Sequence, residues 1–459
     1  MAISIPRGGA GAASGLYAKH ETIYPREVQG RFASLRRWAV VLLLGIYYLL
    51  PWCQFHGRQA VLFDLPARKF YLFGLILWPQ DLIYLTWLLV LAGLSLFFFT
   101  AIAGRLWCGY ACPQTVWTEL FVDIERFIEG DRARRMKRDR GPWTVDKSWR
   151  KFAKHASWLL LAVWTGLTFV GFFNPISPLV RSALHGELSG WPLFWAAFYG
   201  LATYGNAGFL REQVCEYMCP YARFQSAMFD TGTLVITYDA KRGEPRGPHA
   251  RGVDPRSLGQ GDCVDCTLCV QACPTGIDIR EGLQYECIAC AACIDACDSV
   301  MDKLSRPRGL VRYSTAAGGR AASILRPRIL VYAALLITIA IVGATSLVLR
   351  PRVALDVLRD RGVLYRETSS GVENVYSLKI LNKDEQQHRF RLSVAGMTGA
   401  AIDPTDDLTV PAGEILSTTV RVIAPPGSSH GGRAIVFTLA DADHPHRTIT
   451  ERSRFIAPQ

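Results

Sequence analysis

Eight cysteines stand in two matched runs, "CVDCTLCVQACP" and "CIACAACIDACD", and cysteine thiolates bind iron, zinc and copper. Each run has the spacing CxxCxxCxxxC, and the second begins 24 residues after the first, at Cys287 rather than Cys263. Three thiolates this close together can wrap one corner of a cuboidal cluster, and the fourth, further along the chain, reaches the neighbouring cluster. The pattern therefore predicts two [4Fe-4S] clusters with crossed ligands.

The predicted ligand sets exchange their fourth cysteines. One set is Cys263, Cys266, Cys269 and Cys297, and the other is Cys287, Cys290, Cys293 and Cys273. Zinc is the main rival, because four-cysteine zinc sites also use CxxC spacing, but zinc needs neither a third cysteine at the same step nor a crossed fourth. The runs resemble those of bacterial two-cluster ferredoxins, which end in Cys-Pro. Pro274 matches that ending and Asp298 does not.

Two shorter motifs of the form CxxxCP hold four more cysteines: Cys108, Cys112, Cys215 and Cys219. On a helix, residues four apart share a face, so each pair would present two sulfurs together just before its proline. Soft thiolates select Cu(I), zinc or iron-sulfur iron, so the four cysteines indicate a site for a soft metal, and the residues alone leave open which metal it is. The alternative is that these cysteines are small buried residues that only shape the bundle.

The segment after Cys112, residues 118–130, has apolar residues on one helical face and acids on the other, which is typical of a helix in the membrane interface. Its carboxylates are expected on a solvated face rather than as proton donors. They are Glu119, Asp123, Glu125 and Glu129.

Five apolar stretches are predicted to position these motifs by crossing a membrane, which requires roughly 20 apolar residues for a core of ~30 Å. They are Trp38–Trp52, Leu82–Ala103, Ser157–Phe173, Trp191–Leu210 and Ile329–Leu349. The first and third are short enough to be buried core helices instead. Cys53, at the end of the first stretch, has no partner cysteine nearby and is predicted to be structural.

Loop charges predict the orientation. Residues 105–154 hold twelve Lys and Arg, whereas residues 174–190 hold only Arg181 and residues 54–81 hold three. Basic loops stay in the cytoplasm, and no secretory signal opens the chain. Residues 211–328 are therefore expected in the cytoplasm, where thiols stay reduced, and residues 350–459 in the periplasm. The net charge of +12 in a half-apolar chain suits a membrane protein better than a nucleic-acid binder.

The expected fold class is a multi-pass α-helical membrane protein with a ferredoxin-like domain and an all-β immunoglobulin-like C-terminal domain. Apolar and polar residues alternate in four segments of the tail, "VYSLKILNK", "HRFRLSVAG", "STTVRVIAP" and "RAIVFTLAD". Roughly seven short strands are expected in all, as in a β-sandwich. Basic linkers around the cysteine runs are predicted to be mobile tethers. The expected parts are an arm (1–37), a four-span bundle (38–210), a cytoplasmic segment (211–328) with the clusters at about 255–305, a fifth span (329–349) and the tail (350–459).

Taken together, these features resemble the FixG/CcoG family of cytochrome oxidase accessory proteins. The resemblance also rests on "YPREVQGRF", "GRQAVLFDLPARKFYLFG", "WPQD" and "CIDACDSVMDK", in which Asp298 is expected for the family. It implies a bacterial inner-membrane protein that helps to assemble the cbb3-type cytochrome c oxidase. It further implies reduction of Cu(II) to Cu(I), so that a copper-exporting ATPase can supply the oxidase.

Two other classes of function stay open on the residues alone. The chain could be an electron-transfer subunit of a respiratory or quinone-linked complex, or an assembly scaffold whose clusters are structural. The sequence has no CxxCH, Rossmann fingerprint or P-loop, so the electron donor stays unknown. Membrane lipid is an expected partner, nucleic acid is not, and self-association is left open.

Overall fold

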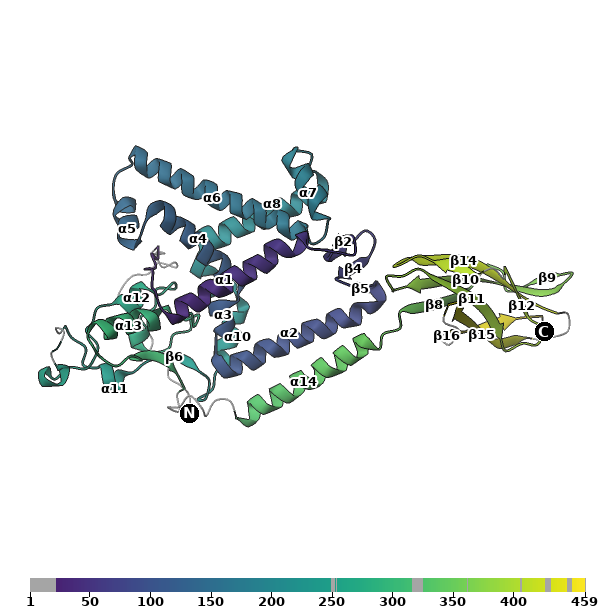
Figure 1. Ribbon diagram of the computed structural model, residues 1–459. Coiled ribbons are helices and arrows are strands. Elements are labelled where there is room, and N and C mark those ends of the chain that lie inside the picture. Colours follow the sequence, from purple (N-terminus) through teal and green to yellow (C-terminus); the bar gives the residue numbers. More distant parts are fainter. Residues whose placement is uncertain are drawn as a thin grey trace, which may run out of the picture. The chain divides into compact units, whose positions relative to one another are not determined.

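The computed structural model describes residues 22–248, 252, 254–315, 325–360, 362–404, 407–425, 431–443 and 448–458 (Figure 1). The chain divides into two compact units, each described here by itself. Unit 1 comprises residues 1–44, 99–162 and 201–326, and unit 2 comprises residues 45–98, 163–200 and 327–459.

Three helices among the described residues are long and apolar enough to cross a membrane. They include α1 (Arg31–Leu49), α2 (Leu82–Ala103) and α14 (Pro327–Val348). Helix α2 has the predicted bounds, and its most apolar part has a mean hydropathy of 2.3 and no buried residue. A helix whose exposed surface is apolar is stable when that surface contacts the hydrocarbon core of a bilayer. These helices therefore identify a membrane protein.

The other two predicted spans also form helices, although neither passes the same test of length and composition. Helix α6 (Val145–Val170) starts within the basic segment that precedes its apolar half. Helix α8 (Gly190–Gly205) is shorter than predicted because the chain continues as a π-helical turn, Asn206–Leu210. Between them lies α7 (Ile176–Leu184). Five crossings therefore stay a prediction.

The cysteine runs belong to unit 1, where a small domain surrounds two short helices. These are α12 (Leu268–Gln271) and α13 (Ala292–Lys303). Strand β6 (Val235–Tyr238) pairs antiparallel with β7 (Val311–Ser314), so the segments before and after the runs join in one ribbon. Ile236 of β6 and Val311 of β7 are buried in one core with Cys269, and Cys293 and Cys297 pack against this core.

Hydrogen bonds fix this domain to the start of α1. Asp295 of α13 is buried, and its Oδ2 accepts from the Ala33 amide at 2.7 Å. The extended arm is also held, because the Arg26 amide donates to the Gln271 carbonyl at 2.8 Å. A carboxylate at a helix N-terminus satisfies otherwise unpaired amides. The domain is therefore docked on the arm and α1, and the mobility of the basic linkers, which lie partly outside the described residues, stays a prediction.

Unit 2 contains the C-terminal β-sandwich. One sheet has the order β12-β14-β10-β8 with β9 beside β10, and the other has the order β13-β11-β15-β16. The four strands predicted from alternation are β10 (Gly371–Asn382), β11 (His388–Ala395), β14 (Ile415–Ala424) and β15 (Gly432–Asp441). The remaining strands are β8 (Val353–Arg359), β9 (Arg366–Thr368), β12 (Ala401–Asp403), β13 (Leu408–Val410) and β16 (Thr448–Ile456). The all-β prediction for the tail is confirmed.

The sandwich core comes from the inward side chains of both sheets. Tyr376, Phe437 and Phe455 are fully buried, and the Tyr376 hydroxyl donates to the Arg454 carbonyl of the facing sheet at 2.9 Å. Within the same unit, Asp81 at the start of α2 binds Arg350 at 2.8 Å and Lys383 at 3.0 Å. Residues 54–81 form short strands, including the antiparallel set β3 (Val61–Asp64), β4 (Lys69–Leu72) and β5 (Leu75–Leu77).

Candidate metal centres

The cysteines of the two runs line two cavities in unit 1. One cavity, of about 370 Å³ including its opening, is bordered by Cys263, Cys266, Cys269 and Cys297. The other, of about 330 Å³, is bordered by Cys273, Cys287, Cys290 and Cys293, with Cys269 between the two. The structure thus brings together the members of each crossed set. Both cavities offer four thiols and apolar walls, which fits a cluster held by cysteine thiolates.

The backbone repeats with the cysteine spacing. Asp265 and Thr267 have positive φ angles of 52° and 54°, and the corresponding residues of the second run, Ala289 and Ala291, have 54° and 61°. Non-glycine residues rarely adopt this conformation because the Cβ crowds the following carbonyl. Paired occurrences at equal positions indicate that each loop is shaped to direct its thiols inward.

Burial opposes free thiolates in both cavities. It raises the pKa values of Cys287 and Cys297 to about 12, and neighbouring cysteine charges act in the same direction. A buried thiolate therefore needs a bound cation. Among the described residues, no three His, Cys, Asp or Glu side chains converge closely enough to hold a single metal ion.

The CxxxCP motifs do not lie on continuous helices, so that prediction is wrong. Cys108 is in α3 (Leu106–Tyr110), whereas Cys112 caps the next helix, α4 (Pro113–Glu129). Cys215 lies in a π-helical turn (Val214–Met218), and Cys219 caps α10 (Pro220–Ala227). Proline disfavours a helical conformation in the residue before it, and this breaks each helix at the second cysteine.

The four CxxxCP cysteines nevertheless come together in unit 1. Burial raises the pKa of Cys108 to about 12, and the nearby charges of Cys112, Cys215 and Cys219 act in the same direction. The amides of Gln114 and Thr115, at the start of α4, bind the Cys112 sulfur and oppose its raised pKa. Helix N-terminal amides favour thiolates, which are soft metal ligands, although the four sulfurs are not placed around a single ion.

A buried glutamine holds Cys108 in place. The Cys108 Sγ lies 3.2 Å from Gln225 Oε1, and Gln225 is fully buried in α10. Its Nε2 donates to the Gly104 carbonyl at 3.1 Å and to the Tyr221 hydroxyl at 3.1 Å. Groups behind a metal ligand fix its orientation and tune its affinity.

Arg105 is a buried cation beside these cysteines, with only 4% of its surface exposed. Its guanidinium donates to the carbonyls of Cys287, at 3.5 Å, and Ala222. No carboxylate among the described residues forms an ion pair with it. Its charge opposes the burial-raised pKa values of Cys108, Cys215 and Cys287. An unpaired buried charge is costly, and thiolates carrying metal would supply the missing negative charge.

Helix α3 contacts the loop that bears the second cysteine run. Cys108 packs against the group of buried residues that includes Ile288 and Cys290. A Cβ on Gly109 would lie 2.9 Å from the carbonyl oxygens of both Ile288 and Ala289. Only glycine allows this approach without movement of the backbone. The two groups of cysteines therefore share a direct protein contact.

The acids of α4 do not all face solvent, which corrects the sequence prediction. Glu125 and Glu129 are 5% and 1% exposed, and Glu125 Oε2 binds Arg135 at 3.1 Å and Arg211 at 2.9 Å. In contrast, the apolar side chain of Phe127 on the same helix is 91% exposed. Basic residues from distant segments pair with the acids, and the amphipathic pattern carried no sign of these partners.

Sequence reasoning missed Arg105 and Gln225 as residues of the site. Arg105 stands three residues before Cys108, and Gln225 stands six residues after Cys219. Their closeness to the CxxxCP motifs was the only available signal. Cys53 is exposed and lies in unit 2, and a purely structural role for it stays a prediction.

Three family descriptions match the chain. The description "4Fe-4S dicluster domain" matches residues 210–316, and "4Fe-4S binding domain" matches residues 84–130. The tail, residues 343–458, matches the immunoglobulin-like fold found at the C-terminus of FixG. Iron-sulfur binding and the immunoglobulin-like tail, both predicted from the sequence, are confirmed.

Curated relatives match over most of their length. Protein RdxB of Cereibacter sphaeroides is 40% identical over 90% of this chain and 91% of its own. Nitrogen fixation protein FixG of Rhizobium meliloti is 42% identical over 84% of this chain and 82% of its own. Protein RdxA of C. sphaeroides is 39% identical over 94% and 96%.

A crystal structure of a FixG-related protein from Vibrio parahaemolyticus covers 24% of this chain and 99% of its own, at 31% identity. Its TM-score of 0.22 is too low to support a fold comparison. The extent and level of identity to RdxB, FixG and RdxA settle the family. The chain belongs to the FixG-like proteins, a family of membrane-bound iron-sulfur electron-transfer proteins, as its motifs predicted.

Proposed function

We propose that this protein reduces Cu(II) to Cu(I) at its CxxxCP cysteines with electrons from two [4Fe-4S] clusters. The proposed ligand sets are Cys263, Cys266, Cys269 and Cys297 for one cluster, and Cys287, Cys290, Cys293 and Cys273 for the other. Bound there, the clusters would supply one electron at a time, and each Cu(II) ion takes up one electron to become Cu(I).

The contact between α3 and the second cysteine run carries this proposal. Cys108 packs against the buried group that includes Ile288 and Cys290, and Gly109 lets the backbone of residues 288–289 come close. An acceptor held at Cys108 would thus be close to the cysteines proposed to hold the second cluster. This placement supports an order in which the CxxxCP site receives electrons from that cluster.

Charge and ligand type favour Cu(I) as the product at this site. Thiolates bind Cu(I) in preference to Cu(II), which raises the reduction potential of the bound ion. Arg105 supplies a buried positive charge that compensates the thiolates. The same features would hold the Cu(I) ion until it is passed on.

The cellular role that we propose follows from the family resemblance. Cu(I) would pass to a copper-exporting ATPase and so reach the cbb3-type oxidase during assembly. The proposed topology has five spans, with the N-terminus and clusters in the cytoplasm and the β-sandwich in the periplasm. Reporter fusions after Ala250 and after Pro425 should report opposite compartments. If both report the same compartment, the proposed topology is wrong.

The decisive experiment replaces Cys108 and Cys112 together by serine. In anaerobically purified protein whose clusters are reduced with dithionite and then freed of it, the rate of Cu(II) reduction should fall ~10-fold or more, as expected for loss of metal ligands. Copper retention should fall with it. The iron content and visible spectrum of the two dicluster cavities should stay unchanged.

Cys53→Ser is the matched control, because it removes an exposed thiol outside the motifs. It should retain wild-type copper binding and reduction. Wild-type rates and wild-type copper retention in the Cys108/Cys112 variant would overturn the proposal.

A second candidate for the same four cysteines is a third iron-sulfur cluster. The match of residues 84–130 to a 4Fe-4S binding domain favours it, because Cys108 and Cys112 are the only cysteines in that range. Iron analysis separates the candidates, since two [4Fe-4S] clusters contain ~8 iron atoms and three contain ~12. A loss of ~4 iron atoms in the Cys108/Cys112 variant would favour the third cluster.

A further inference from the structure

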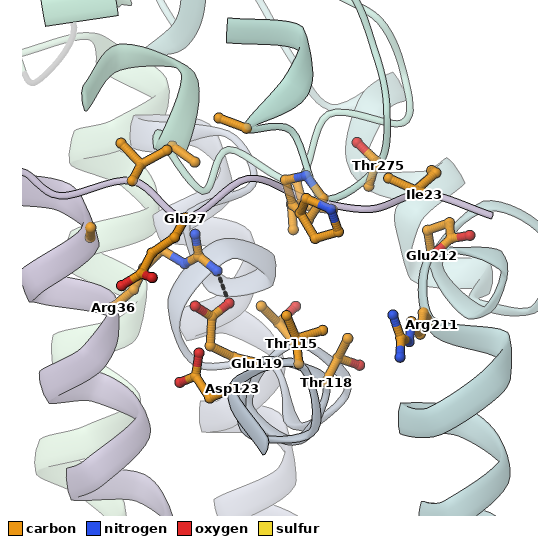
Figure 2. A pocket seen from close by; sticks show the side chains of 18 of the residues that line it. Ile23, Glu27, Arg36, Thr115, Thr118, Glu119, Asp123, Arg211, Glu212 and Thr275 are labelled. Atoms are coloured by element: carbon orange, nitrogen blue, oxygen red, sulfur yellow. Dashed lines mark hydrogen bonds and ion pairs between the residues drawn. The ribbon is translucent and has the colours of Figure 1, made fainter. Parts of the chain in front are cut away.

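We propose that a cavity in unit 1 binds a quinol, which supplies the electrons for the proposed function. The cavity measures about 1120 Å³ including its mouth. Its walls come from the N-terminal arm, α1, α4, the segment that begins at Arg211, and the cysteine-run domain (Figure 2).

The cavity reaches both groups of cysteines. Ala272 and Pro274, which flank Cys273, lie in its wall, as does Ile288, between Cys287 and Cys290. On another side, Cys215 of the CxxxCP site lines it directly. A molecule bound here would therefore contact the protein segments that carry proposed cluster and copper ligands.

The charges in the walls favour a neutral ring over an anionic nucleotide. Arg36 is paired with Glu119 (Figure 2), Arg126 with Asp123 at 2.8 Å, and Arg211 with Glu125 at 2.9 Å. A phosphate would have to compete with these carboxylates for the three arginines, and the other two arginines of the wall, Arg26 and Arg37, are exposed to solvent. Apolar side chains of the arm, α1 and α4, including Val28, Val40 and Val122, complete the walls.

The position of α1 gives a lipid-soluble donor access to this region. The apolar stretch that begins at Arg31 is one of the candidate membrane spans, and Val40 lines the cavity. Trp38, Val41 and Leu42, on neighbouring turns of the same helix, are 73%, 59% and 62% exposed. An exposed apolar surface beside a cavity is where a quinol would arrive from the membrane.

Quinol oxidation also needs proton acceptors, and α4 provides two carboxylates. A quinol becomes a quinone by losing two electrons, one to each cluster, and two protons. Glu119 and Asp123 stand one helical turn apart in the wall (Figure 2). Partial burial and the neighbouring Glu119 charge raise the pKa of Asp123, which favours proton uptake. Its side chain is 49% exposed, so it can release each proton to water.

The Thr118 hydroxyl can orient one oxygen of the ring, because the Thr115 hydroxyl already donates to the Cys108 carbonyl at 2.6 Å. Thr115, Thr118 and Gln114 lie in the same wall, one turn or less apart on α4. The Gln114 Nε2 already donates to Thr118 Oγ1 at 3.3 Å and to the Asn206 carbonyl at 2.9 Å. These bonds fix the amide and leave the Thr118 hydroxyl hydrogen available to donate.

The inference rests on the proposed electron-transfer function, and its test separates the two. Purified protein with oxidised clusters is mixed anaerobically with decylubiquinol, and bleaching of cluster absorbance is followed. Wild-type protein should be reduced, whereas Asp123→Asn should react roughly 100-fold more slowly, as for loss of a general base. Dithionite should reduce both equally.

Asp302→Asn is the matched control, because Asp302 is an acid on α13 that pairs with Arg308 outside the cavity. It should react like wild type. If decylubiquinol fails to reduce wild-type clusters, or reduces the Asp123 variant at the wild-type rate, the quinol inference is wrong. Cu(II) reduction by dithionite-reduced protein does not require electron transfer from the quinol to the clusters. If Cu(II) is not reduced in that assay, the result counts against the proposed function and not against the quinol site.

Binding can be tested without electron transfer. An azido-quinone should label peptides from the arm, α1 or α4 on illumination, and unlabelled quinone should compete. Thr118→Trp, which places a large side chain in the cavity wall, should abolish that labelling while leaving cluster spectra intact. Labelling that persists in Thr118→Trp, or that lies only on other segments, would overturn the assignment.

Discussion

The paired cysteine runs and the CxxxCP motifs direct thiols inward by different means. In each run, left-handed residues between the cysteines curl a loop, as at Thr267 and Ala291. In each CxxxCP motif, a proline breaks a helix and leaves the second cysteine at the next N-terminus, as at Cys112. The loops create cavities that they line themselves. The motifs build a site only when two distant segments meet.

This difference separates a self-contained centre from an assembled one. Residues of 263–297 alone provide all eight thiols of the two cavities. The CxxxCP site needs residues near 108 and near 219, and it also uses Gln225 and Arg105. We therefore expect substitutions in the runs to act on one cluster each, and substitutions around the motifs to act on coupling and potential.

Replacing Cys273 by serine should have the largest effect and tests the crossed assignment. The cluster proposed at Cys287, Cys290 and Cys293 would lose a ligand, so iron should fall by ~4 atoms per chain. Anaerobic iron and sulfide analysis with electron paramagnetic resonance would measure this. Cys297→Ser is the matched variant and should damage the other cluster. The reverse pattern would show that the fourth cysteines are not exchanged.

Gly109→Ala tests the contact between the two groups of cysteines. The new methyl group would lie 2.9 Å from two carbonyl oxygens of residues 288–289, and such overpacking costs about 1–3 kcal/mol. The loop must move away from α3, so Cu(II) reduction by pre-reduced protein should slow while the iron content stays normal. Stopped-flow absorbance would measure the rate.

Gly205→Ala is the control for this variant, because no atom lies within 4 Å of the added Cβ. It should leave the rate unchanged. Equal rates in Gly109→Ala and wild type would mean that electrons do not cross at α3.

Arg105→Gln tests whether the buried charge affects the reduction potential of the nearby centres, because it removes the charge and keeps polar side-chain atoms. A buried cation stabilises the reduced, more negative form of a nearby centre, so its loss should lower the reduction potential. We expect about a tenfold change in the equilibrium, which is about 59 mV for one electron. Redox titration monitored by spectroscopy would measure the shift.

Arg105→Lys keeps the charge and should lower the potential less. If Arg105→Gln leaves every potential unchanged, the cation does not compensate the thiolates.

The sequence predicted the centres that depend on local spacing and missed those features that depend on distant partners. Repetition of CxxCxxCxxxC was enough to pair residues 263–273 with residues 287–297. The helix breaks at Cys112 and Cys219 could have been inferred from the following prolines. By contrast, the burial of Glu125 depends on Arg135 and Arg211, and the docking of the domain depends on Asp295 capping α1.

The helices predicted to cross the membrane show the same contrast between features that the local sequence predicts and features that it does not. Helix α2 was predicted to the residue because its apolar run is uninterrupted. Helix α8 ends early because a π-helical turn follows it, and no periodic pattern marks that turn. In the tail, alternation identified the long strands β10, β11, β14 and β15. The three-residue strands β9, β12 and β13 are too short to show a period.

The smallest expected effect concerns the conformational free energy that the cysteine loops lose because non-glycine residues in them have positive φ angles. Thr267 is exposed and β-branched with a φ of 54°, a conformation that costs an L-residue roughly 1–2 kcal/mol. Thr267→Gly should therefore stabilise the cluster domain by up to about 1 kcal/mol, measured as a higher urea midpoint for loss of cluster absorbance. Ser299→Gly, inside α13, is the control and should destabilise the domain by about 0.5 kcal/mol, because glycine is a poor helix former.

A lower midpoint for Thr267→Gly would mean that the threonine side chain stabilises the domain by more than its backbone conformation costs. The Thr267 Oγ1 accepts from Gln271 Nε2 at 3.0 Å, so Gln271→Ala, which removes this bond and keeps the backbone, would measure that contribution separately.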